Sequence, residues 1–263
     1  MKLITASDNQ TLKNLKSLLT AKGRQEHSLF IAEGPHLVEE ALNAGVEIAY
    51  VAVSASDEAK YAVLANVCVK KGAEGLVLAD RLFEAVAETK TPQGILAAVR
   101  IPKLGLDWPG LADGRIAVVM ENLQDPCNLG TILRTALAVN ASFAVLCGDC
   151  ADPWSPKAVR ASQGAAMHLK IIEAVSAPEA IGLLNGLGWH TACGHLRGTD
   201  FFSRSSHART AIVIGNETAG VSDEAAAACL ALYRLPMSGP AESLNAAVAA
   251  GIMLYDIFRA SGL

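Results

Sequence analysis

A polar turn followed by a lone arginine is the first place in the chain where residue types and spacing suit chemistry. The stretch ENLQDPCNLGTILRTALAVN, residues 121–140, ends a predicted strand, turns, and begins an apolar helical pattern. Asn128 can cap that helix, and Arg134 follows it by less than two helical turns. Taken alone, such an arginine is typical of a surface or salt-bridged side chain. Further polar loops at the same edge of a sheet would instead favour a ligand-binding or catalytic site that includes this arginine.

Two more strand-to-helix loops carry polar residues. In AIVIGNETAGVSDE, residues 211–224, Gly215 ends a predicted strand and Glu217 follows it. In RLPMSGPAESLNAAVAAG, residues 234–251, Asn245 lies in the first turn of the last helix, where an amide can face a ligand. Each loop alone is typical of an ordinary turn. Three of them in one parallel sheet are expected to converge on one edge, which predicts a ligand site there.

Other familiar motifs are weak or absent. Cys147 and Cys150 form a CxxC pair, but no second pair follows at the spacing of a zinc site. The loop after Ile214 lacks the lysine and Ser/Thr of a phosphate loop, and it is not a GxGxxG turn. The histidines are scattered and no GxSxG elbow is present, so hydrolase chemistry has little support. We expect no metal.

The alternation of short apolar strands with helical patterns predicts an α/β chain in two blocks. Residues 115–263 favour a mostly parallel sheet with helices on both faces. Residues 1–100 form a smaller block that begins with a predicted helix over 9–21. The segment IPKLGLDWPGLADG, residues 101–114, is rich in proline and glycine and is a predicted linker. The predicted strands lie near 29–32, 48–53 and 95–99, and near 116–120, 143–147, 168–172, 189–193, 211–214 and 233–236.

The charge distribution favours a local anion-binding surface on an acidic chain. The 263 residues are 51% hydrophobic and 18% charged, with a formal net charge of −4. Residues 1–30 are nevertheless rich in lysine and arginine, and such a patch can bind phosphates. The first residues lack the apolar core of a secretion signal, and no apolar run reaches membrane-spanning length. A cytoplasmic location is therefore expected, which agrees with cysteines that form no disulfide framework.

The three polar loops together resemble the motifs of the SpoU/TrmH-type RNA ribose methyltransferases of the SPOUT class. The matching segments are NLQDPCNLGTILRTA, IVIGNETAG and LPMSGPAESLNAAVA, in the family's order and strand context. SPKAVRASQGA, residues 155–165, is similar to the segment between the first two motifs. NLKSLL, FIAEGPHLVEEAL and TPQGILAAVR are similar to the family's N-terminal substrate-binding domain. The resemblance implies a catalytic domain with a deep C-terminal trefoil knot, and a small α/β domain of the kind found in RNA-binding ribosomal proteins.

The resemblance also implies an enzyme that methylates a ribose 2′-hydroxyl of RNA with S-adenosylmethionine. A sulfonium methyl group is already activated, so the enzyme mainly has to align it with the ribose oxygen, and no metal is required. By position in the motifs, the implied catalytic residues are Asn128, Arg134, Glu217 and Asn245. The implied cofactor-binding residues are Thr191, Gly215, Leu235, Met237, Ser243 and Leu244.

Arginine is a physically demanding choice of general base, because it stays protonated in nearly every protein setting. We therefore expect Arg134 to hold a phosphate and to stabilise the developing alkoxide, and we leave the base unassigned. Contacts to RNA are expected from Lys13, Lys16 and Arg24 in the N-terminal block, and from Arg160.

Ribosomal RNA is favoured over transfer RNA as the substrate, with the large subunit preferred, because transfer RNA relatives often have only short N-terminal extensions. A transfer RNA ribose methyltransferase and an antibiotic-resistance methyltransferase acting on ribosomal RNA are the alternatives. A non-catalytic RNA-binding or ribosome-assembly protein is the alternative from a different class, and the complete set of four implied catalytic residues argues against it.

A homodimer is also predicted, because the last helix has an Ala/Gly-rich face and the apolar residues Ile252, Met253, Leu254, Ile257 and Phe258.

Overall fold

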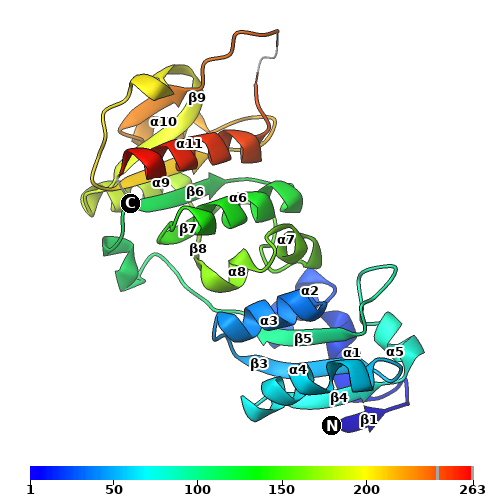
Figure 1. The fold of residues 1–263 in the computed structure, drawn as a ribbon. Helices are drawn as coiled ribbons and strands as arrows, with labels where there is room; N and C mark the ends of the chain where they lie inside the picture. Colours follow the sequence, from blue (N-terminus) through cyan, green and yellow to red (C-terminus); the bar gives the residue numbers. More distant parts are fainter. Residues whose placement is uncertain (241–242, 262–263) are drawn as a thin grey trace. The chain divides into compact units, whose positions relative to one another are not determined.

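The computed structural model describes residues 1–240 and 243–261, which are organised as two α/β units (Figure 1). Among these residues, no helix combines the length and the apolar character needed to cross a membrane. The first unit comprises Met1–Pro102 and Asp152–Met167, and the second comprises Lys103–Ala151 and His168–Leu263. The strand and helix pattern of the sequence does not predict that Asp152–Met167, a segment of the second block, belongs to the first unit.

The first unit is built on a mixed sheet in the order β1-β4-β3-β5-β2. Strand β3 pairs in parallel with β4 and antiparallel with β5, which also pairs antiparallel with β2. The strands are β1 (Lys2–Ile4), β2 (Leu29–Glu33), β3 (Ile48–Ser54), β4 (Glu74–Leu78) and β5 (Ile95–Arg100). The helices are α1 (Gln10–Ser17), α2 (Ala21–His27), α3 (Pro35–Asn43), α4 (Glu58–Lys70), α5 (Asp80–Glu84) and α7 (Pro156–Ala161), and α8 (Ala165–His168) begins in this unit.

The strands predicted in the first block are confirmed, whereas the single helix predicted over 9–21 is wrong. Helix α1 ends at Ser17, and Thr20 then caps α2 by accepting a hydrogen bond from Gly23 N at 3.1 Å. A Cβ atom on Gly23 would lie 2.1 Å from the Ser17 carbonyl oxygen, so this close approach of the chain requires glycine. The turn chemistry of threonine and glycine therefore overrides the helical periodicity.

Arg24 is part of the interior of the first unit. It is 4% exposed, its guanidinium pairs with Asp152 (Nη2 to Oδ2, 2.6 Å), and its Nη1 donates to the Leu18 carbonyl at 2.8 Å. Phe30 of β2 packs against Trp154, with ring centroids 4.9 Å apart. These contacts make the segment that begins at residue 152 part of the core of this unit, and they leave little of the Arg24 guanidinium available to RNA.

The second unit is built on a sheet in the order β11-β9-β10-β6-β7-β8, and every neighbouring pair is parallel. The predicted mostly parallel sheet is thereby confirmed. Its strands are β6 (Ile116–Glu121), β7 (Phe143–Cys147), β8 (Lys170–Ala174), β9 (His190–Asp200), β10 (Thr210–Ile214) and β11 (Ala231–Arg234). Its helices are α6 (Pro126–Ala138), α9 (Ala177–Gly186), α10 (Asp223–Ala228) and α11 (Ala246–Ala260), with short 3₁₀ turns η1 (Pro109–Ala112) and η2 (Phe201–Ser203).

Helices cover both faces of this sheet. Ala117 and Val119 of β6 belong to a core that includes residues of α9 and α10. On the other face, α11 packs along α6 and also contacts β10 and β6 (Figure 1). Because β6 and β10 are buried on both faces, their sequences are continuous apolar runs rather than alternating ones.

Three strand boundaries differ from those predicted for the second block. Strand β8 begins at Lys170 because His168 ends helix α8, and β11 ends at Arg234 rather than continuing through a proline, which cannot donate to the ladder. Strand β9 extends well beyond Cys193, to Asp200. The trefoil knot stays a prediction.

Candidate active site

The carboxyl ends of β6 and β10 lie side by side near the centre of the parallel sheet. The chain leaves β6 through α6 towards β7, and it leaves β10 through α10 towards β11, on the opposite side. Two neighbouring strands whose connections depart in opposite directions leave a crevice between the loops, and ligands of such sheets bind there. The loops after β6 and β10 therefore border the expected site.

The first loop, residues 122–125 after β6, is fixed by hydrogen bonds from two other loops. Asn122 has a left-handed φ of 52°, its Oδ1 accepts from Asp149 N at 2.8 Å, and its carbonyl accepts from Asn216 Nδ2 at 2.9 Å. Asp125 then caps α6 with its side chain. A left-handed conformation is unfavourable for most non-glycine residues, and the surrounding bonds hold Asn122 in it.

The second loop, residues 215–222 after β10, closes on itself. Asn216 and Gly220 exchange two backbone hydrogen bonds of 3.0 and 2.9 Å. A Cβ atom on Gly215 would lie 2.1 Å from the Gly220 carbonyl carbon, so only glycine fits at the end of β10. The result is a tight loop whose next side chain, Glu217, is presented towards the first loop.

Glu121, the last residue of β6, anchors the far end of the second loop. It is 6% exposed, and its carboxylate accepts from Ser222 N at 2.8 Å and from Ser222 Oγ at 2.7 Å. A buried carboxylate requires such donors. Sequence reasoning missed this role, although an acidic residue at the end of an apolar strand was the available signal.

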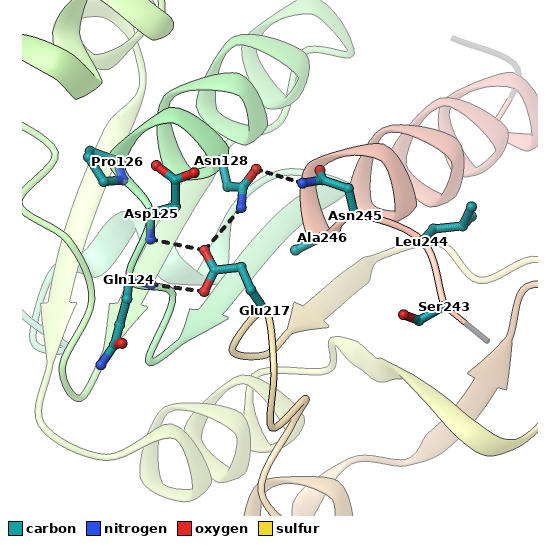
Figure 2. A pocket seen from close by; sticks show the side chains of 9 residues that line it. All are labelled: Gln124, Asp125, Pro126, Asn128, Glu217, Ser243, Leu244, Asn245 and Ala246. Atoms are coloured by element: carbon teal, nitrogen blue, oxygen red, sulfur yellow. Dashed lines mark hydrogen bonds between the residues drawn. The ribbon is translucent and has the colours of Figure 1, made fainter. Parts of the chain in front are cut away.

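Glu217 joins the second loop to the first (Figure 2). Its Oε1 accepts from Asp125 N at 2.9 Å and from Asn128 Nδ2 at 3.1 Å, and its Oε2 accepts from Gln124 N at 3.2 Å. Hydrogen bonds to an ionised carboxylate are stronger than those between neutral groups. One side chain thus holds both the backbone of the first loop and the side chain of Asn128.

Hydrogen bonding outweighs burial in setting the pKa of Glu217. Partial burial raises that pKa, but hydrogen bonds from the backbone of Asp125, the amide of Asn128 and the backbone of Gln124 lower it, so the pKa falls below its ordinary value of 4.5. The carboxylate is therefore ionised at neutral pH, and its oxygens already accept hydrogen bonds. Such a group is a poor general base and a good structural acceptor.

Asn245 connects the third loop to the same place. Its Oδ1 accepts from Ala247 N at 2.9 Å, which caps α11, and its Nδ2 donates to Asn128 Oδ1 at 3.0 Å (Figure 2). The amide of Asn128 thus accepts from Asn245 and donates to Glu217. We call Asn128, Glu217 and Asn245 the Asn–Glu–Asn cluster. The three loops predicted to converge on one edge of the sheet do so here.

The Asn–Glu–Asn cluster borders an open pocket (Figure 2), and a second cavity of about 410 Å³ adjoins it. The two share Glu217, Ser243, Leu244 and Ala246 in their lining, so a ligand in the cavity can present a group to the polar pocket. Most side chains around the cavity are apolar, which suits an organic ligand with a flat ring.

Five of the six residues implied to bind the cofactor line this cavity, namely Gly215, Leu235, Met237, Ser243 and Leu244. Thr191 does not. Its side chain is fully buried, and its hydroxyl donates to Asn185 Oδ1 at 2.6 Å and accepts from Leu230 N at 3.3 Å. Thr191 thus fixes the chain around β9 rather than facing a ligand.

Arg134 lies on α6 outside both linings. Its side chain is exposed, and it makes no hydrogen bond or ion pair within the residues that the structure describes. Lys13 and Lys16 are exposed on α1. Arg160 instead forms an ion pair with Glu88. The exposed basic members of the implied catalytic and RNA-binding sets are therefore Arg134, Lys13 and Lys16.

Of the two CxxC cysteines, Cys150 supports the first loop with its thiol. Cys150 Sγ donates to the Met120 carbonyl at 3.4 Å and accepts from Leu123 N at 3.4 Å. Burial raises the pKa of the Cys147 thiol to about 12, which makes it unreactive. Over residues 1–240 and 243–261, no group of three His, Cys, Asp or Glu side chains is placed to bind a metal ion.

Comparison with known proteins gives two family matches. Residues 115–255 match the SpoU rRNA Methylase family, and residues 9–97 match the MRM3-like substrate binding domain. The 23S rRNA (guanosine(2553)-2'-O)-methyltransferase RlmP of Bacillus subtilis is 34% identical over 261 residues, with 98% of this chain and 99% of the relative covered.

Solved structures match the fold of this chain over nearly its whole length. The AdoMet-bound rRNA methyltransferase from Sinorhizobium meliloti has a TM-score of 0.88 and 31% identity, and the match covers 98% of each chain. The SpoU methyltransferase AviRb from Streptomyces viridochromogenes, in complex with AdoMet, has a TM-score of 0.85 and 26% identity, with 96% of this chain and 98% of that chain covered. The expected α/β fold with an N-terminal substrate-binding domain is thereby confirmed.

The lowered pKa of Glu217 predicts the pH at which its carboxylate stops holding the first loop. A carboxylate with a depressed folded-state pKa stabilises the fold fully above its unfolded-state pKa, and this contribution is lost as the pH falls through the folded-state value. We expect Glu217→Gln to lower the Tm by the same amount from about pH 8 to about pH 5, and by progressively less below the ordinary value of 4.5.

Thermal unfolding followed by circular dichroism measures this difference. Glu224→Gln, at an exposed carboxylate on α10, is the matched control and should leave the Tm nearly unchanged over the same range. If Glu217→Gln had the same Tm as wild type at neutral pH, the ionised Glu217 carboxylate would not be what holds the first loop.

Proposed function

Since the chain belongs to the SpoU rRNA methylase family, we propose that it transfers a methyl group from S-adenosylmethionine to the 2′-hydroxyl of a ribose in ribosomal RNA. The observation that carries this proposal is the Asn–Glu–Asn cluster, held at the carboxyl ends of β6 and β10 beside an apolar cavity. The large-subunit RNA is favoured because curated relatives are named for guanosine 2553 and uridine 2479 of 23S rRNA. Such a substrate implies a cytoplasmic protein.

The cavity fits S-adenosylmethionine in size and in chemistry. Gly215 leaves no side chain at the end of β10, so the backbone of the second loop can border a ligand closely. Leu235, Met237 and Leu244 provide apolar contacts, and Ser243 provides a hydroxyl at the border with the polar pocket. We propose that these residues hold the cofactor.

The bound cofactor supplies an activated methyl group on a sulfonium, and the product is a 2′-O-methyl ribose with S-adenosylhomocysteine and a released proton. The protein has to hold the ribose oxygen in line with the methyl group and to exclude competing water. We assign the positioning of the ribose to Asn128 and Asn245, whose amides are fixed by the hydrogen bond between them. Glu217 fixes Asn128 and the first loop, and we do not assign it the proton.

Arg134 carries a positive charge on the exposed side of α6, the helix whose first residues border this pocket. Because its guanidinium has no partner among the described residues, it is available to a phosphate of RNA. We propose that Arg134 holds the phosphate beside the target ribose and stabilises the alkoxide that develops during methyl transfer.

The N-terminal unit is proposed to select the RNA. Lys13 and Lys16 lie exposed on α1, three residues apart and therefore on one face of that helix. Phosphate contacts through such residues make binding steeply dependent on salt. Arg24 is left out of this surface, because it is buried against Asp152.

A homodimer through α11 is proposed as the functional assembly. Part of the apolar surface of this helix is used within its own unit, by Met253, Leu254 and Ile257. A second stripe at helical spacing is exposed, by 50%, 37% and 55% for Val248, Ile252 and Tyr255. A contiguous exposed apolar stripe of this kind is typical of a self-association surface.

The direct test of the proposed function is a map of ribose methylation in ribosomal RNA. We expect deletion of the gene to remove one 2′-O-methyl group from 23S rRNA, and the wild-type gene but not an Asn245→Ala variant to restore it. Protection of ribose positions from alkaline cleavage measures this. An unchanged ribosomal map with a lost transfer RNA methyl group would support the transfer RNA alternative instead.

Replacing Arg134 separates a catalytic arginine from a surface one. We expect Arg134→Ala to keep the Tm and the S-adenosylmethionine affinity, and to slow single-turnover methylation by about 10²-fold, as for loss of one oriented electrostatic group. Arg134→Lys should restore little activity, because the planar fork is lost. Arg115→Ala, at the amino end of β6, is the control. Near-normal turnover in Arg134→Ala would remove this residue from the mechanism.

The dimer proposal predicts that a charge in the exposed stripe dissociates the protein. We expect wild type to sediment as a dimer at micromolar concentration and Ile252→Asp to sediment as a folded monomer, because a carboxylate would be buried without a partner. Val63→Asp places the same charge on α4, where Val63 is 80% exposed, and should leave the dimer intact. A monomeric wild-type protein would refute the assembly.

A further inference from the structure

Strand β9 leaves the sheet for several residues at the edge of the cofactor cavity. It pairs with β11 at Cys193, opposite Leu232, and again at Thr199, opposite Tyr233. Because Leu232 and Tyr233 are consecutive, residues 194–198 have no partner in the ladder. We call these residues, GHLRG, the β9 excursion.

The β9 excursion is held at its carboxyl end. A Cβ atom on Gly198 would lie 2.6 Å from Tyr233 N, so the chain rejoins β11 too closely for any other residue. Arg197 pairs with Asp223 at the start of α10 (Nη2 to Oδ1, 3.1 Å). The close approach at Gly198 thus fixes where the excursion rejoins β11.

The β9 excursion forms part of the cavity wall through Gly194, His195 and Leu196. These residues do not border the polar pocket that contains the Asn–Glu–Asn cluster. Leu196 is 63% exposed although it is large and apolar. An apolar side chain in the wall of an open cavity is suited to cover the face of a flat ring.

The position of the proton on His195 follows from a hydrogen bond within the excursion. Arg197 N donates to His195 Nδ1 at 3.1 Å, so in the neutral ring Nδ1 is the unprotonated nitrogen. The proton is then on Nε2, which makes Nε2 a hydrogen-bond donor. His195 is half-buried and lines the cavity, and its Nε2 makes no hydrogen bond to the residues that the structure describes.

We propose that His195 is a specificity-determining residue of the cofactor cavity, whose Nε2–H donates a hydrogen bond to a ring nitrogen of the adenine while Leu196 covers the purine face. This inference rests on the proposed use of S-adenosylmethionine. Adenine presents unprotonated ring nitrogens in its plane, which a neutral imidazole N–H can address. The carboxylate of the cofactor is better suited to a cation, and Arg234 supplies one in the same cavity wall.

Calorimetric titration with S-adenosylhomocysteine and its 1-deaza, 3-deaza and 7-deaza analogues tests the contact. We expect one of the three analogues to bind wild type about tenfold more weakly than the parent, because it lacks the acceptor of one hydrogen bond. In His195→Ala the parent should bind about tenfold more weakly, and the same analogue should lose nothing further. A penalty for that analogue that persists in His195→Ala would overturn the proposal.

His195→Asn separates the contact from the shape of the loop. The Oδ1 of asparagine stands where Nδ1 stands in histidine and can accept from the Arg197 backbone, but its side chain has no group at the position of Nε2. We expect the same loss of affinity as in His195→Ala. Wild-type affinity in His195→Asn would mean that His195 only shapes the excursion, which overturns the proposal. His207→Ala, an exposed histidine outside the cavity, is the matched control and should bind like wild type.

Decarboxylated S-adenosylmethionine distinguishes the two ends of the cofactor. If His195 contacts adenine, His195→Ala weakens binding of this analogue as much as that of S-adenosylmethionine. A loss that disappears with the carboxylate would assign the contact to the carboxylate and overturn the adenine assignment. A wild-type protein that binds none of these ligands would contradict the proposed function itself, which is a different result from wild-type binding that is indifferent to His195.

Discussion

The carboxylate of Glu217 is the point through which the active-site loops are joined. It extends from the loop after β10 and accepts hydrogen bonds from two backbone amides and one side chain of the loop after β6. Asn128, fixed in this way, then accepts a hydrogen bond from Asn245 at the start of α11. Glu217 lies 89 residues from Asn128 in sequence and Asn245 lies 117 residues from it, so the cluster joins segments that are far apart in the chain.

This arrangement explains how so few ionisable groups can serve a methyl transfer. The reaction needs alignment more than acid–base chemistry, and hydrogen bonds that fix two amides provide alignment. The same bonds lower the pKa of Glu217 and occupy its oxygens, which suits it to holding a loop rather than to taking a proton. Beneath it, Glu121 fastens the other end of the second loop through Ser222, so the two carboxylates hold one loop from its two ends.

The sequence sufficed to predict those features that depend on strand order and loop position. In a parallel sheet the carboxyl ends of strands share an edge, so Asn128, Glu217 and Asn245 could be expected to meet. Features that depend on a distant partner or on side-chain direction could not be predicted. Arg24 belongs by sequence to a basic segment, but a partner 128 residues away buries it. Thr191 is implied to bind the cofactor by the family resemblance, yet its hydroxyl donates to Asn185 inside the fold.

Hydrogen exchange at the amides of Gln124 and Asp125 tests the central role of Glu217 most directly. These N–H groups lie in a loop, and both donate to the Glu217 carboxylate. At one neutral pH, NMR-detected exchange should be slow for both amides in wild type and markedly faster in Glu217→Ala, while Ala247 N, which donates to Asn245, keeps its rate. Unchanged protection of Gln124 and Asp125 in that variant would contradict the account.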